Sequence, residues 1–220
     1  MEESLELDRK ETYNGSVWFQ KRTLRIALVS SFTGLAVVLG YALAYLPNIE
    51  VFTMMIFLGG FILGKRDGLI IGVLSSLIFV ILNPYGASPL FLLSYQISHY
   101  SLVGLIGGVV KNYLSKKNYF KPKRDLYLFQ IMFILGCIGA FITFFYDLIS
   151  TLIGAFIVTF RFSSFPTTME FFSQLQVSYN FFIISYIYGI PFTAIHLIGN
   201  TLEFIFILPG LISLIYKLLN

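Results

Sequence analysis

The sequence contains few charged residues and almost no cysteine. Charged side chains make up 12% of the 220 residues, and Cys137 is the only cysteine. A single cysteine inside an apolar stretch excludes a disulfide framework and a cysteine-based metal site within one chain. The 15 basic residues flank apolar stretches and form no stripe with stacking aromatic residues, which argues against nucleic-acid binding. We expect them to contact the cytoplasmic lipid surface instead.

Motifs of common enzymes are also missing. The chain has no His-Glu-x-x-His segment, no pair of histidines at metal-ligand spacing and no Gly-x-Ser-x-Gly turn. Residues 59–65 read G-G-F-I-L-G-K, the first part of a phosphate-binding loop, but Arg66 stands where that loop needs serine or threonine. We therefore expect a protein that is not an enzyme, with no resident metal, no cofactor and no ATPase of its own.

Apolar residues dominate what is present. They make up 57% of the chain, well above the share in soluble domains, which indicates an all-α integral membrane protein. We expect one membrane domain, residues 23–220, after a polar cytoplasmic tail, residues 1–22. About six transmembrane helices are predicted, at residues 26–45, 51–64, 68–82, 90–110, 128–146 and 192–216.

The basic residues predict the orientation of these spans. Groups of them precede the first span, follow the second and follow the fourth, and four crossings put all three groups on one side. The positive-inside rule identifies that side as the cytoplasm. With six crossings Lys217 also lies inside, and Arg161 is the only one of the 15 basic residues outside. Eight crossings, with residues 126–160 and 177–219 each forming a hairpin, also keep Lys217 inside, so this alternative stays open.

The resulting expectation is a multi-pass protein of the plasma membrane with both termini in the cytoplasm. The apolar runs around residues 126–160 and 177–219 are longer than one straight crossing needs. An aromatic segment, residues 179–189, precedes Pro191. We expect this part of the chain to form an extracellular lid or re-entrant segment between the fifth and sixth helices.

Two polar clusters bracket the second and third spans. Asn48 and Glu50 precede the second span, and Asn83 and Tyr85 follow the third. If both spans cross, the two clusters lie on the same outer face and supply donors, acceptors and an aromatic wall, as a ligand pocket requires. The alternative is that Asn48 and Glu50 only cap a helix.

A polar stripe occurs on the last span. His196, Asn200 and Glu203 are spaced i, i+4 and i+7, so they project from one helical face. Ionisable groups inside a membrane are costly, so each needs a partner or a function. The stripe either binds a ligand or forms hydrogen bonds between helices, with Asp147, Gln96 or His99 as partners.

The first span carries small residues at helical spacing. They are Ala27, Ser31, Gly34, Ala36 and Gly40. Small residues on one face permit close helix contact. Such a face packs within the same protein or forms a docking surface for another membrane subunit.

Together these features resemble the substrate-binding S component of an energy-coupling-factor (ECF) vitamin transporter. The resemblance covers most of residues 23–217 and rests on four stretches: RIALVSSFTGLAVVLGYALAYLPNIE, GGFILGKRDGLIIGVLSSLIFVILNPYG, SLVGLIGGVV and IPFTAIHLIGNTLEFIFILPG. It implies a membrane subunit that takes up a vitamin or related micronutrient together with a transmembrane coupling subunit and two cytoplasmic ATPases. The family docks its coupling subunit through an Ala-x-x-x-Ala pattern on the first helix, where this chain has Ala27 and Ser31.

The resemblance also implies a pocket made of outer loops and the outward halves of later helices. With the polar residues above, the expected substrate-binding set is Asn48, Glu50, Asn83, Tyr85, Gln96, Asp147, His196 and Asn200. Two alternatives remain: a self-sufficient secondary transporter that relays protons through Asp147 or Glu203, and an intramembrane enzyme.

Overall fold

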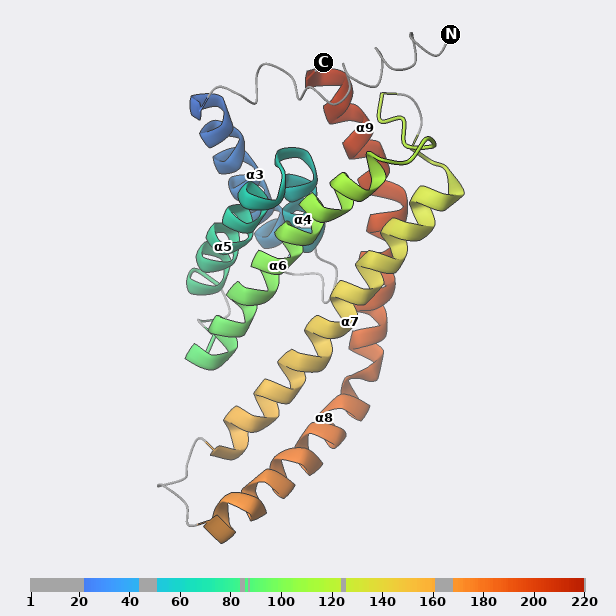
Figure 1. Ribbon diagram of the computed structural model, residues 1–220. Coiled ribbons are helices and arrows are strands. Elements are labelled where there is room, and N and C mark those ends of the chain that lie inside the picture. The colour runs from blue at the N-terminus through green and yellow to red at the C-terminus, as the bar shows by residue number, and fades with distance from the viewer. Residues whose placement is uncertain are drawn as a thin grey trace, which may run out of the picture.

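The computed structural model describes residues 22–43, 51–83, 86, 88–123, 126–160 and 168–219, and every regular element in these ranges is helical (Figure 1). Asn48, Glu50 and Tyr85 lie outside the described residues. The helices are α3 (Arg22–Ala42), α4 (Phe52–Leu63), α5 (Lys65–Ile81), α6 (Leu90–Leu114), α7 (Phe129–Phe160), α8 (Thr168–Leu202), the π-helix η1 (Glu203–Ile207) and α9 (Leu208–Leu219).

Among the residues that the structure describes, four helical stretches are long and apolar enough to cross a membrane. They are Arg22–Ala42, Leu90–Leu114, Phe129–Thr159 and the continuous run Phe172–Leu218. This confirms the predicted all-helical, membrane-embedded class. The helices of the predicted second and third spans are shorter, since α4 has 12 residues and α5 has 17. A helix needs about 20 residues to cross the hydrocarbon core alone.

Helix α4 forms the centre of the bundle. Every residue from Phe52 to Ile62 is buried, and the helix packs against α3, α5, α6 and α9. A helix that is apolar on all sides belongs in a core, where no side has to face water. At 1.5 Å per residue α4 is about 18 Å long, so it reaches only part of the way across a membrane. Protein surrounds it on all sides.

Glycines let α4, α5 and α6 touch backbone to backbone. A Cβ atom on Gly60 would lie 1.9 Å from the carbonyl oxygen of Gly104, and one on Gly68 would lie 2.3 Å from the same oxygen. A Cβ on Gly107 would lie 2.2 Å from the carbonyl oxygen of Phe57. These distances are far shorter than any van der Waals contact, so only glycine fits at these positions. The sequence indicated close packing of small residues on the first span only. The closest backbone contacts lie instead among α4, α5 and α6.

One end of the bundle collects the basic segments. Arg25 forms an ion pair with Asp67, whose side chain is buried, and Arg25 Nη2 lies 2.8 Å from Asp67 Oδ1. Lys111 Nζ donates a 2.8 Å hydrogen bond to the carbonyl of Ile62, near the end of α4. The start of α3, the turn between α4 and α5 and the end of α6 therefore meet, and α9 ends nearby (Figure 1). This is the grouping that the charge pattern requires.

Helices α7 and α8 form a long hairpin that extends beyond the other helices at the opposite end (Figure 1). Each helix is continuous, so neither apolar run folds back on itself as the eight-crossing alternative requires. The aromatic segment 179–189 and Pro191 both lie inside α8. The expectation of a re-entrant segment there is therefore wrong. A proline need not end a helix in apolar surroundings, where neighbouring groups satisfy the freed backbone.

Candidate ligand-binding site

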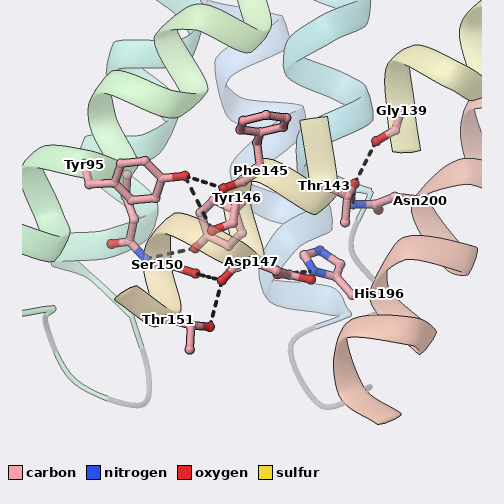
Figure 2. A network of polar contacts seen from close by, with 11 residues as sticks. Tyr95, Gly139, Thr143, Phe145, Tyr146, Asp147, Ser150, Thr151, His196 and Asn200 are labelled. Atoms are coloured by element: carbon pink, nitrogen blue, oxygen red, sulfur yellow. Dashed lines mark hydrogen bonds and ion pairs between the residues drawn. The ribbon is translucent and has the colours of Figure 1, made fainter. Parts of the chain in front are cut away.

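Two side-chain hydrogen bonds connect α7 to α8. His196 Nδ1 lies 2.9 Å from Asp147 Oδ1, and Asn200 Nδ2 donates a 2.9 Å bond to Thr143 Oγ1 (Figure 2). Thr143 and Asp147 are four residues apart on one helix, as are His196 and Asn200 on the other. The bonds therefore lie one above the other along the helix pair.

The direction of the second bond is determined by its surroundings. Thr143 donates its hydroxyl hydrogen to the carbonyl of Gly139 at 2.9 Å, so its oxygen can only accept from Asn200. The amide of Asn200 must therefore present its NH₂ group to Thr143. The Oδ1 atom of Asn200 has no hydrogen-bond partner, and water cannot replace one because the residue is only 1% exposed.

Two further acceptor oxygens nearby are also buried and have no hydrogen-bond partner. Asp147 uses Oδ1 for the bond to His196, while Asp147 Oδ2 is buried and has no hydrogen-bond partner. Gln96 donates through Nε2 to the hydroxyl of Tyr146 at 3.1 Å, and Gln96 Oε1 has no hydrogen-bond partner. A buried polar atom without a partner costs about 1–3 kcal/mol. Three such oxygens on neighbouring helices need a reason.

Aromatic rings surround these groups. Tyr146 lies at the centre of the aromatic cluster, with ring centroids 5.0 Å from His99, 5.6 Å from Tyr100, 6.0 Å from Tyr95 and 6.2 Å from His196. The hydroxyl of Tyr95 bonds the carbonyl of Phe145 at 3.2 Å, which ties α6 to α7 (Figure 2). The carboxylate, the amides and the rings thus form one polar and aromatic network.

The network lies far from the basic end. Along α6, Tyr95 is about 24 Å from Lys111, and along α7, Asp147 is about 27 Å from Phe129 at 1.5 Å per residue. These distances are close to the thickness of the hydrocarbon core of a membrane, which is about 30 Å. Beyond it, α7 and α8 continue as the long hairpin.

The structure brings together half of the predicted substrate-binding residues. Gln96, Asp147, His196 and Asn200 all belong to the network. Asn83 lies just after α5, where its carbonyl accepts a 2.9 Å bond from the N–H of Gly86. The bond between His196 and Asp147 is one of the interhelical contacts that the sequence left open.

Sequence reasoning missed Tyr95, Thr143 and Tyr146. The spacing of Thr143 and Asp147 repeats that of His196 and Asn200, and this match was a usable signal. The tyrosines gave no signal, because the chain has 14 of them.

Glu203, the third residue of the polar stripe, begins the π-helix. It is buried, and the N–H of Leu208 bonds its carbonyl five residues back. Pro209 has no N–H to donate to the carbonyl of Ile205, which explains why the helix widens here. Tyr127 donates a 2.8 Å bond to the carbonyl of Phe206 within the same widened turn.

Possible metal ligands do not gather in the part of the chain that the structure describes. Within the ranges that the structure describes, no group of three His, Cys, Asp or Glu side chains lies close enough to hold a metal ion. The two histidines each contact the ring of Tyr146.

The small residues of α3 divide between two faces. Ala36 is completely buried, and a Cβ atom on Gly40 would lie 2.9 Å from the ring of Phe79. These two residues pack inside the chain, so they cannot belong to a docking surface. Ala27, Ser31 and Gly34 are exposed, and a Cβ atom on Gly34 would meet nothing within 4 Å.

Comparisons with known proteins do not add to this picture. The chain matches no protein-family model, no curated protein and no solved structure. The network and the exposed face of α3 are therefore the features from which a function can be inferred.

Proposed function

We propose that this chain is the substrate-specific membrane subunit of an ECF-type importer. It binds a vitamin or related micronutrient from outside and delivers it across the plasma membrane together with a coupling subunit and two cytoplasmic ATPases. The observation that carries the proposal is the network of α6, α7 and α8, which gathers buried acceptors and aromatic rings near the face opposite the basic end. Pockets for small molecules combine apolar walls with a few convergent polar groups in this way.

The placement of the network supports an outward-facing site. The basic segments gather at one end of the bundle, and the positive-inside rule makes that end cytoplasmic. A ligand arriving from outside then meets the network after crossing only a few ångströms of the apolar core. Asn48, Glu50 and Tyr85 are proposed to belong to the outer mouth of this site.

The transport test uses the complex as it is purified from native membranes. We expect a tagged chain to copurify with a membrane subunit and two ATPases in mild detergent. Reconstituted into vesicles with ATP on the cytoplasmic side, the complex should take up the small molecule that mass spectrometry identifies on the purified chain. Uptake should fall to background with ATPase-inactive variants of the cytoplasmic subunits.

The same vesicles test the alternative of a secondary transporter. If the chain alone transports at the full rate in a proton gradient, with no ATPase present, the importer proposal is wrong. Asp147 and Glu203 would then be the residues to examine as proton carriers.

The exposed face of α3 is the proposed contact with the coupling subunit. Gly34→Leu should reduce copurification of that subunit at least tenfold, because the new side chain stands where a second helix has to approach closely. Ligand binding by the isolated chain should not change, since nothing lies within 4 Å of a Cβ atom at this position. Equal amounts of coupling subunit on wild type and Gly34→Leu, measured by quantitative mass spectrometry, would remove this face from the proposal.

A further inference from the structure

We infer that the network binds a nitrogen-containing aromatic ring that carries N–H groups, and that it rejects carboxylated rings of the same size. This inference rests on the proposed function and names the chemical class of its substrate. It follows from which atoms of the network already have partners and which do not.

Three oxygens of the network accept no hydrogen bond: Gln96 Oε1, Asp147 Oδ2 and Asn200 Oδ1. All three are acceptors, and the carboxylate of Asp147 can only accept. The orientation of Asn200 is determined by Thr143, which donates to Gly139 and so must accept from the amide. A ligand that completes these bonds must therefore supply hydrogens, and a carboxylate has none to give.

The rings determine the shape of the ligand. Tyr95, His99, Tyr100 and Tyr146 form a closed set of neighbouring rings, with successive ring centroids 5.4–6.0 Å apart. The hydroxyl of Tyr146 accepts the hydrogen bond from Gln96, and Tyr146 precedes Asp147 in the chain. Flat rings stack on such surfaces, and cationic rings are also attracted to their faces. A donor-rich aromatic ring, neutral or cationic, fits both requirements.

The probes are 4-aminopyrimidine and pyrimidine-4-carboxylate, which share a ring and differ in hydrogen-bond donors and charge. Binding to the purified chain in nanodiscs is measured by ligand-observed NMR, with no partner subunit present. For ligands of about eight heavy atoms, dissociation constants of about 1 mM are expected, and this method detects binding of that strength. We expect the dissociation constant of the amine to be at least tenfold lower than that of the carboxylate.

Asp147→Asn is the decisive variant. The carboxylate offers two acceptor oxygens, whereas the amide offers one acceptor oxygen and one NH₂ group, so the change removes an acceptor and adds a donor beside His196. The affinity for the amine should fall at least tenfold, and the preference between the two probes should shift toward the carboxylate. Asn200→Leu should also lower the affinity for the amine. The matched control is Ser76→Ala, a buried hydroxyl that bonds its own helix at the carbonyl of Gly72.

Three outcomes would overturn the inference: no binding of the amine to wild type, equal or tighter binding of the carboxylate, or an amine affinity that Asp147→Asn leaves unchanged. Because Asp147→Asn preserves the side-chain volume, it keeps the test valid even if Asn200→Leu fails to fold. The two proposals can fail separately. ATP-driven uptake of a ligand without donor groups would retire this inference alone, while amine binding by a chain that transports without ATPases would retire only the importer proposal.

Discussion

Gly104→Ala is expected to prevent stable folding of the bundle. The added methyl group would lie 1.9 Å from the carbonyl oxygen of Gly68, and both atoms are held by helix backbones that cannot turn away. To remove this clash, α5 and α6 have to separate by more than about 1 Å. This separation also opens the contact between Gly60 and Gly104. Overpacking a well-filled core costs about 1–3 kcal/mol when side chains can adjust, and more here because backbone has to move. We expect a loss of about 3 kcal/mol or more.

The measurement is the yield of monodisperse protein after detergent extraction, together with the thermal unfolding midpoint by far-UV circular dichroism. Gly154→Ala is the matched control, because it adds the same methyl group to a helix where nothing lies within 4 Å. This control should be neutral or slightly stabilising, since alanine favours a helix over glycine by about 1 kcal/mol.

Gly60→Ala combined with Gly104→Ala should cost less than the sum of the two, because both changes open the same interface. A Gly104→Ala protein as stable as wild type would disprove the backbone contact.

The sequence predicted the class of the fold better than the lengths of its helices. Apolar composition and basic flanks indicated a multi-span helical protein, and the described part of the chain contains four helical stretches that are long and apolar enough to cross a membrane. Apolar length alone does not tell whether protein or lipid surrounds a helix, and for this reason the sequence did not show that α4 is a 12-residue helix buried in the core. The same ambiguity placed a re-entrant segment at residues 179–189, where α8 is continuous.

The glycine contacts illustrate a second limit. Gly60, Gly68 and Gly104 lie on three different helices, and no single-helix spacing relates them. The small-residue pattern on α3 follows one helix and was visible for that reason. Periodicity within one helix predicts which residues share a face of that helix. It does not predict how two helices are aligned against each other.

The candidate site shows the same division. Helical spacing predicted that His196 and Asn200 share a face, and both do contact α7. The choice of partner among Asp147, Gln96 and His99 depends on how far one helix is shifted against the other, which periodicity does not contain. Thr143 was missed because a threonine inside an apolar helix more often bonds its own backbone, which Thr143 also does.

The pair of Asp147 and His196 should show unequal costs when one partner is removed. His196→Ala leaves a carboxylate that is only 14% exposed without its donor, and an unsatisfied buried group costs about 1–3 kcal/mol, and more when it is charged. Asp147→Ala leaves an imidazole, which can be neutral, with an unmet donor at a cost of about 1–3 kcal/mol. We therefore expect His196→Ala to lower the free energy of unfolding more than Asp147→Ala does.

A double-mutant cycle in detergent micelles measures the interaction itself. The double variant should cost less than the sum of the single ones by about 1–3 kcal/mol, because neither charge nor unmet donor remains. Ser94→Ala is the control, since its hydroxyl bonds only the carbonyl of Leu90 on its own helix among the contacts described, and it should add independently to either variant. Equal single costs that add without coupling would show that the two side chains do not depend on each other. Unequal, coupled costs would show that Asp147 and His196 together hold α7 against α8.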